Sequence, residues 1–185
     1  MADEIKRQLI HCSGIIFSIL IFFSRGLAFV LALSAFLFLF LYAYYRSFGI
    51  KSKMLEKKIS LVERREEKRI FPFRGALYFF FSIMLCILLF PVNVASAAIA
   101  VLAIPDMLST IVGIKYGRHK FFVNEVKSLE GSLAFFVSAF LILLFYVDVY
   151  HALLISLITT CVEVYPKIND NLSVPLATGL LMVVL

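Results

Sequence analysis

Long uninterrupted apolar runs dominate this sequence and limit what it can fold into. The run Gly26–Tyr45 has 20 residues and no charged side chain. About 20 apolar residues in a helix span the ~30 Å hydrocarbon core of a bilayer. Hydrophobic residues make up 62% of the chain and charged residues 16%, against about half and about a quarter in soluble domains. We therefore expect an all-α, polytopic membrane protein, and neither a soluble enzyme nor a disulfide-stapled secreted domain.

Seven apolar runs are candidates for transmembrane helices. They are Leu9–Phe23, Gly26–Tyr45, Gly75–Val92, Asn93–Ile114, Gly131–Val149, Tyr150–Tyr165 and Ser173–Leu185. The first and last are short for a full crossing, so about six to eight spans fit the pattern. The prediction is one membrane domain over residues 1–185 with about seven helices.

The basic residues predict the orientation of these helices. Ten of the 18 Lys and Arg lie in residues 46–74, and four more lie in residues 115–127. Because the turns between the runs are tight, both clusters and the basic pair Lys6-Arg7 fall on one face. The positive-inside rule makes that face, with the N-terminus, cytoplasmic. The compact length and tight outer turns favour a prokaryotic plasma membrane.

The segment 46–74 carries ten basic residues and four acidic ones. Its apolar residues Leu55, Ile59 and Val62 recur at helical spacing. An amphipathic basic helix of this kind is typical of a segment that lies on anionic lipid headgroups. Nucleic-acid binding is the alternative, but no folded module supports it. The membrane surface is the expected partner, and no nucleic acid is expected.

One carboxylate, Asp106, lies inside the fourth run. An ionised carboxylate within a bilayer costs about 2.5–3.5 kcal/mol or more on insertion scales, so it normally faces a partner or a polar cavity. Ser109 follows within one helical turn. Gly113 and Gly117 are four residues apart, a spacing that lets either a phosphate or another helix come close.

Two further polar stretches fall on the same cytoplasmic face, in the loops 115–130 and 166–172. The first contributes Arg118, Lys120, Lys127, Glu130 and Gly131; the second, with the end of the preceding run, contributes Glu163, Asp170 and Asn171. Carboxylates, fixed cations and glycines on one rim suit a magnesium-bound polyphosphate. The residues alone therefore predict a nucleotide-using enzyme that acts on a membrane-dissolved substrate.

The order of these motifs resembles a known family of lipid kinases. The motifs are Asp106-x6-Gly113-x3-Gly117-x2-Lys120, then Lys127-Ser-Leu-Glu130-Gly131-Ser, then Glu163 followed by Asp170-Asn171-Leu-Ser-Val-Pro175. Together with Lys6-Arg7, His11 and Gly14 near the N-terminus, they resemble the dolichol kinase, phytol kinase and CTP-dependent diacylglycerol kinase family. The resemblance runs from about residue 4 to residue 180.

The resemblance implies transfer of the γ-phosphate of CTP to the hydroxyl of a membrane lipid, with Mg²⁺ or another divalent cation. On this reading Asp106 and Asp170 hold the metal, with Glu130 as a further candidate, and Glu163 accepts the hydroxyl proton. The triphosphate would be bound by Arg118, Lys120 and Lys127 beside Gly113, Gly117 and Gly131, with Asn171 orienting a ligand. Asp106 and Lys127 would be catalytic together with Glu163. His11 either reaches this rim or has a packing role.

The sequence departs from the family at two positions. Pro105 precedes Asp106 where the family usually has glycine, and Asn169 stands where an acid is often found. Asparagine offers a metal an oxygen but no charge, so the number of ions is left open.

Two other functions are weighed against the kinase. Phosphatidate cytidylyltransferases share the Asp106-to-Gly131 core pattern, but the C-terminal signature of that family is missing here. A transporter would place ionisable residues on both sides of the midplane, whereas these gather in the cytoplasmic half. The acceptor (polyprenol, phytol, geranylgeraniol or diacylglycerol) and the oligomeric state are left open.

Overall fold

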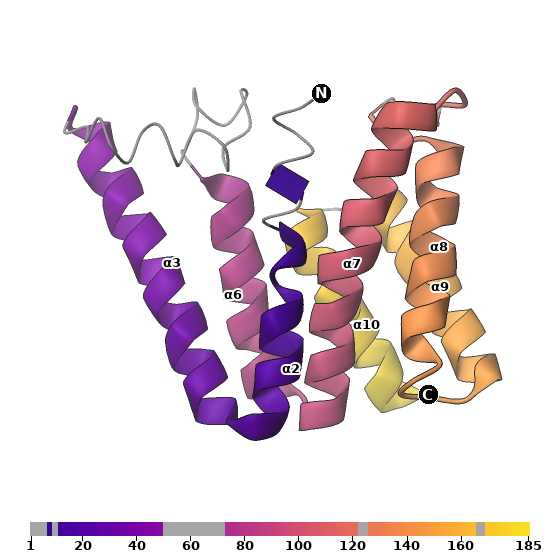
Figure 1. Cartoon of the computed structure of the whole chain (residues 1–185), viewed down its shortest axis with the longest axis horizontal. Helices are drawn as coiled ribbons and strands as arrows, with labels where there is room; N and C mark the ends of the chain where they lie inside the picture. Colours follow the sequence, from indigo (N-terminus) through magenta and orange to yellow (C-terminus); the bar gives the residue numbers. More distant parts are fainter. Residues whose placement is uncertain (1–6, 9–10, 50–72, 122–125, 166–168) are drawn as a thin grey trace.

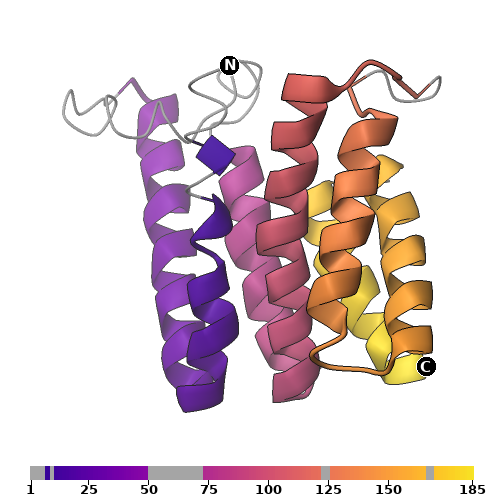
Figure 2. The same cartoon turned by 45° about the vertical axis from the view of Figure 1, so that its right-hand side comes forward.

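The computed structural model describes residues 7–8, 11–49, 73–121, 126–165 and 169–185. In these ranges the chain forms α2 (Ile15–Phe23), α3 (Arg25–Ser47), α6 (Arg74–Leu89), α7 (Val92–Tyr116), α8 (Leu129–Leu143), α9 (Val149–Val164) and α10 (Asp170–Val184). The helices run alternately in opposite directions within one bundle (Figures 1 and 2). An isolated bridge between Lys120 and Ser128 is the one β-type pairing within the described ranges. The all-α prediction is confirmed for this part of the chain.

The prediction of about seven transmembrane helices is not confirmed. By length and composition two described helices could cross a membrane, Arg25–Arg46 with 22 residues and Val92–Tyr116 with 25. The other apolar helices are shorter: α6 and α9 have 16 residues each, and α8 and α10 have 15. At 1.5 Å per residue, about 16 residues give a helix of ~24 Å, which is less than the ~30 Å hydrocarbon thickness.

Helix α7 is the centre of the bundle. It packs against α2, α6, α8 and α10, and many of its buried residues are small, including Ala95, Ala97, Ala98 and Ala100. Small side chains let neighbouring helices approach closely on every side. One apolar core lies between α7 and α2, α3 and α6, and a second lies between α7 and α8, α9 and α10.

The turn between α2 and α3 is tied to the end of α6 by Arg25. Its Nε donates to the carbonyl oxygen of Ile87 over 2.8 Å, and its guanidinium also donates to the carbonyl oxygen of Phe90 over 3.0 Å. The last carbonyls of a helix have no partner within that helix. Arg25, which lies at the opposite end of the bundle from residues 115–127, therefore has a structural role. Counting charges in the sequence did not reveal this role.

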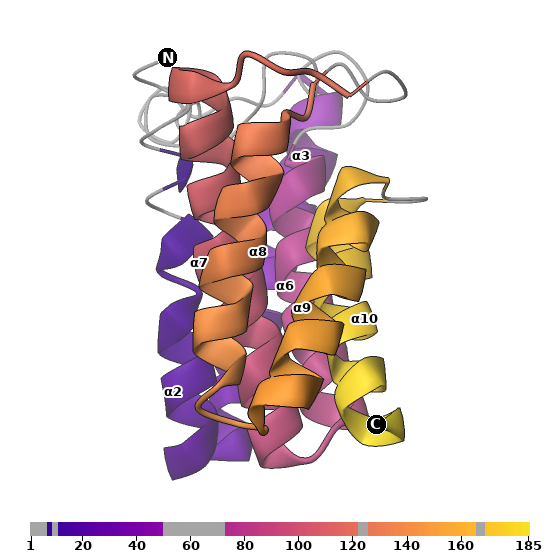
Figure 3. The ribbon, with the colours of Figure 1, turned by 90° about the vertical axis from the view of Figure 1, so that its right-hand side faces the viewer.

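The predicted polar loops are described only in part. Most of the basic segment 46–74 lies outside the described residues, as do residues 122–125 and 166–168. The described remainder of the two candidate loops lies at the end of the bundle where α7 ends and α8 begins. Figure 3 shows that α7 extends further toward this end than α9 and α10 do.

Candidate active site

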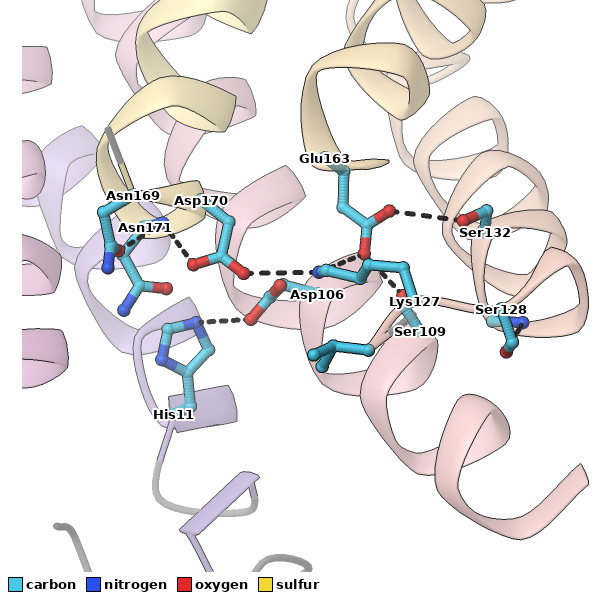
Figure 4. A network of polar contacts seen from close by, with 12 residues as sticks. His11, Asp106, Ser109, Lys127, Ser128, Ser132, Glu163, Asn169, Asp170 and Asn171 are labelled. Carbon is cyan, nitrogen blue, oxygen red and sulfur yellow. Dashed lines mark hydrogen bonds and ion pairs between the residues drawn. The ribbon is translucent and has the colours of Figure 1, made fainter. Parts of the chain in front are cut away.

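Lys127 occupies the centre of a buried polar cluster. It directly precedes Ser128, the N-cap of α8, whose Oγ accepts from the amide of Gly131 over 3.2 Å. Backbone pairing holds this stretch in place, because the amide of Leu129 donates to the carbonyl of His119 over 2.9 Å. The Lys127 side chain is consequently directed inward and is 16% exposed (Figure 4).

The Lys127 ammonium bridges two carboxylates from different helices. Its Nζ lies 2.5 Å from Oε1 of Glu163 in α9 and 3.3 Å from Oδ2 of Asp170 at the start of α10. Asp106, in α7, is close enough to act electrostatically on the same ammonium. We call Asp106, Lys127, Glu163 and Asp170 the Lys127 cluster.

Glu163 is fully buried and is held by groups from three segments. Besides Lys127, the hydroxyl of Ser109 in α7 donates to Oε1 over 2.8 Å, and the hydroxyl of Ser132 in α8 donates to Oε2 over 3.4 Å. The side chain has 0% exposure. A buried charge is tolerated when it is both paired and hydrogen-bonded, and Glu163 meets both conditions.

The electrostatics of the cluster keep Lys127 charged. Burial by itself would lower the pKa of Lys127, but the neighbouring carboxylates, Asp170 first, outweigh burial and raise that pKa above its ordinary value. Asp106 and Glu163 act in the same direction. The site therefore presents a permanent positive charge among three carboxylates.

Asp106 is contacted from the segment that precedes α2. The Nε2 atom of His11 lies 3.4 Å from Oδ2 of Asp106, and the two side chains are 13% and 7% exposed. The His11 ring also packs on Phe79 of α6, with ring centroids 4.3 Å apart. Sequence reasoning left the role of His11 open, because nothing in the pattern showed that its helix returns to α7.

The Asn-Asp-Asn stretch is the start of a helix. Asn169 is the N-cap of α10, and its side chain accepts from the amide of Asn171 over 3.0 Å. The side chain of Asn171 donates from Nδ2 to the carbonyl oxygen of Gly75 over 2.9 Å. The predicted loop 166–172 is therefore wrong for residues 170–172, which are helical because Asn169 satisfies the free amides of the first turn.

Among the described residues, the Glu130 side chain hydrogen-bonds to the turn after α7 and not to the residues of the Lys127 cluster. Its carboxylate accepts from the amides of Arg118 and His119 over 3.2 and 3.3 Å, and its Oε1 lies 2.7 Å from Nδ1 of His119. Hydrogen bonds, first from its own backbone amide and then from His119, lower the pKa of Glu130 to about 2. Glu130, predicted as a metal candidate, here holds the turn that follows α7.

The two remaining predicted cations are on the surface. Arg118 and Lys120 are exposed, and the Nζ of Lys120 donates to the carbonyl oxygen of Val126 over 3.4 Å. They belong to the same chain reversal that carries Lys127 and lie outside the buried cluster.

The three predicted phosphate-contacting glycines lie where α7 packs on α8. A Cβ atom on Gly131 would come within 2.8 Å of the carbonyl oxygen of Ser109, and one on Gly117 would come within 2.6 Å of the Ser128 hydroxyl. A Cβ on Gly113 would lie 3.2 Å from the same hydroxyl. Close packing therefore accounts for Gly117 and Gly131 without a phosphate, whereas the space at Gly113 is less tight.

Two prokaryotic proteins match almost the whole chain. The uncharacterized protein RP860 of Rickettsia prowazekii is 31% identical over 187 residues, covering 94% of this chain and 90% of that protein. The uncharacterized protein MJ1137 of Methanocaldococcus jannaschii is 32% identical over 181 residues, covering 93% and 88%. The chain belongs to the same family as these two proteins. No family model and no solved structure matches it.

Plant phytol kinases match a shorter part. The probable chloroplastic phytol kinase 1 of Glycine max is 36% identical over 127 residues, which cover 57% of this chain and 41% of that protein. The chain thus spans less than half the length of that relative. Over this part the chain is similar to plant phytol kinases.

The carboxylate oxygens of the Lys127 cluster are possible ligands for a metal ion. No set of three or more His, Cys, Asp or Glu side chains in the described part of the chain is arranged to hold a metal ion by itself. Magnesium is usually bound by one or two carboxylates together with substrate phosphates. Asp106 and Asp170 supply two carboxylates beside Lys127, so the residues fit an ion that is shared with a polyphosphate.

Proposed function

We propose that the protein is a CTP-dependent lipid kinase. It transfers the γ-phosphate of CTP to the hydroxyl of a membrane lipid, either an isoprenoid alcohol such as polyprenol, dolichol, phytol or geranylgeraniol, or diacylglycerol. The observation that carries this proposal is the buried Lys127, bridging Glu163 and Asp170, in a chain 36% identical to a probable phytol kinase over 127 residues. Similarity to a probable phytol kinase supports a lipid alcohol as the acceptor.

Lys127 is the group that binds the transferred phosphoryl in this scheme. Phosphoryl transfer is catalysed mainly by positioning and by neutralising charge on the phosphate oxygens. A lysine whose pKa is raised stays protonated at all physiological pH values, and Glu163 with its two serine donors fixes its position. Arg118 and Lys120, exposed on the neighbouring turn, attract the nucleotide from solution.

The transfer step exchanges one bond to phosphorus for another. The lipid hydroxyl oxygen forms a bond to the γ-phosphorus while the bond to the β–γ bridging oxygen breaks, and CDP leaves with that electron pair. The hydroxyl proton passes to a carboxylate of the Lys127 cluster. Glu163 accepts that proton, because Asp106 and Asp170 are the proposed ligands of the metal ion. The Glu163 oxygens already accept hydrogen bonds from Lys127, Ser109 and Ser132, and a carboxylate has further lone pairs.

A divalent cation would be held by Asp106 and Asp170 together with phosphate oxygens. When bound, such an ion neutralises charge on the β- and γ-phosphates. The hydrogen bonds of Glu130 to the 118–119 amides assign it to the turn and leave two carboxylates for the ion.

The proposed reaction takes place at the cytoplasmic face of a membrane, in a prokaryote the plasma membrane. Two described helices are long and apolar enough to span a bilayer, and an acceptor with a hydrocarbon tail is dissolved in that bilayer. The basic segment 46–74, with ten basic residues and four acidic ones, would rest on anionic headgroups.

A donor and acceptor panel tests this function. The purified protein in lipid vesicles is incubated with Mg²⁺ and with phytol, geranylgeraniol, a polyprenol or diacylglycerol, each with CTP or ATP. We expect an alcohol-dependent lipid monophosphate with CTP, and loss of product when EDTA replaces Mg²⁺. Product with ATP and none with CTP would overturn the donor assignment. No lipid phosphate from any pair would overturn the kinase.

A further inference from the structure

A small pocket lies beside the Lys127 cluster, between the segment before α2, helix α6 and the start of α10. Its volume is about 80 Å³, far below the ~300–1,000 Å³ of sites that enclose a whole small molecule. Its lining is polar on one side and apolar on the other: Arg7, His11, Ser13 and Asn171, and Gly75, Ala76, Phe17, Phe79 and Phe80. The pocket has room for one end of a long ligand and not for a whole small molecule.

Two polar side chains connect this pocket to the cluster. His11 lines the pocket and lies 3.4 Å from Asp106 through its Nε2 atom. Asn171 also lines it and follows Asp170, whose carboxylate is 3.3 Å from the Lys127 ammonium. His11 therefore links the pocket to Asp106, and Asn171 is the chain neighbour of Asp170.

The other wall of the pocket is aromatic. Phe79 and Phe80 are adjacent in α6 with ring centroids 5.3 Å apart, and Phe17 of α2 lies 6.0 Å from Phe80. Rings of phenylalanine offer apolar contact and no hydrogen-bond donor. The aromatic wall suits a hydrocarbon chain, while Arg7, His11, Ser13 and Asn171 can hydrogen-bond a polar end group such as a hydroxyl.

The position of the pocket relative to Lys127 indicates which substrate it binds, the nucleotide or the lipid alcohol. In phosphoryl transfer the attacking and leaving oxygens lie roughly in line on opposite sides of the phosphorus. Figure 4 shows His11 and Asn171 on one side of Lys127, and Ser128 and Ser132, at the start of α8, on the other. The exposed cations Arg118 and Lys120 belong to the turn that leads into α8, so the nucleotide approaches from there and the acceptor from the pocket.

We propose that this pocket binds the hydroxyl-bearing end of the lipid alcohol, with the first carbons of the tail against Phe17, Phe79 and Phe80. The proposal rests on the proposed function, since it assigns the acceptor site of that reaction. His11 and Asn171 are positioning residues that direct the hydroxyl toward the Lys127 cluster.

The test is photolabelling of the full-length protein in vesicles. The probe is a long-chain isoprenoid alcohol with a diazirine within a few carbons of the hydroxyl, and labelled residues are identified by mass spectrometry. We expect labelling of the pocket residues, with competition by excess unlabelled alcohol and none by CTP. Competition by CTP alone would assign the pocket to the nucleotide. Labelling of lipid-exposed helices without competition would show that no acceptor pocket exists. Either result overturns the proposal.

Two variants provide an independent measurement. Ala76→Phe fills the pocket, and Leu133→Phe adds a ring at an exposed position on α8. We expect Ala76→Phe to raise the KM for the alcohol by about tenfold or more, with the KM for CTP unchanged, and Leu133→Phe to change neither. Phe80→Ala, which opens the wall, replaces Ala76→Phe if that variant does not fold. An unchanged alcohol KM in a folded pocket variant contradicts the proposal.

The photolabelling separates this inference from the proposed function. If the pocket is labelled and protected by alcohol while CTP yields no lipid phosphate, the acceptor site stands and the kinase fails. If phosphate is transferred and the label lies elsewhere, the kinase stands and the pocket assignment fails.

Discussion

The Nζ atom of Lys127 lies 2.5 Å from Oε1 of Glu163, a carboxylate with 0% exposure. The two residues belong to different parts of the chain, one just before α8 and the other near the end of α9. Because water does not reach Glu163, its negative charge depends on this ammonium and on the serine hydroxyls beside it. The pair therefore contributes both to the stability of the bundle and to the charge of the proposed site.

Replacing Lys127 with methionine should destabilise the fold strongly. The substitution leaves a buried carboxylate without its cation, which costs about 3–5 kcal/mol. The double variant Lys127→Met with Glu163→Gln should lose less than the sum of the single losses, because neither charge remains. Denaturant titration in detergent micelles measures all three variants, and Arg118→Met, on the surface, is the matched control. Additive losses would show that the two residues are not coupled.

Replacing Ser109 or Ser132 with alanine should lower the free energy of unfolding by different amounts. The hydroxyl of Ser109 donates to Glu163 over 2.8 Å and that of Ser132 over 3.4 Å. Ser109→Ala should lower the free energy of unfolding by about 1.5–3 kcal/mol, the usual range for a hydrogen bond to a charged group. Ser132→Ala should lower it less. Denaturant titration measures both losses. Equal losses would contradict the difference in hydrogen-bond length between the two serines.

Alanine scanning of the glycines distinguishes helix packing from phosphate binding. Gly131→Ala brings a methyl group within 2.8 Å of a backbone oxygen, and overpacking of this kind costs about 1–3 kcal/mol. At Gly113 the nearest atom would be a hydroxyl oxygen 3.2 Å away, and alanine gains about 1 kcal/mol in helix propensity, so Gly113→Ala should be nearly neutral. A Gly113→Ala variant that keeps its stability but loses CTP affinity would restore the phosphate role.

The contribution of Glu130 should depend on pH. The pKa of Glu130 is lowered to about 2 from an ordinary value of 4.5, so the folded state favours the ionised form. Its stabilising contribution is complete above pH 4.5 and is lost as the pH falls toward 2. The Tm of the wild type should exceed that of Glu130→Gln at neutral pH, and the difference should shrink across this window. A difference that is constant with pH would contradict the hydrogen-bonded carboxylate.

The helices were largely predictable because apolar runs and charged boundaries are local properties of the sequence. Each of the seven predicted runs overlaps a helix of the structure. The start of α10 was placed at Ser173, three residues after its position at Asp170. The N-cap role of Asn169 explains the difference, since the same asparagine is equally typical of a turn.

The sequence predicted which residues form the site better than it predicted how they contact one another. Asp106, Lys127, Glu163 and Asp170 were all candidates, and the structure brings these four together. The position of His11 beside Asp106 could not be foreseen, because it depends on how α2 packs against α7. The engagement of Glu130 with the 118–119 amides depends on a chain reversal that no periodicity indicates.

The most direct test of the central claim follows the fate of each phosphate of CTP. The protein in vesicles is given Mg²⁺, an isoprenoid alcohol and phosphatidate, with CTP labelled in one sample at the γ-phosphate and in another at the α-phosphate. A lipid kinase moves label into the lipid phase from the γ position alone, and the Lys127→Met variant, at a temperature where it is folded, moves almost none. Label that enters the lipid from the α position would instead identify a cytidylyltransferase and contradict the account.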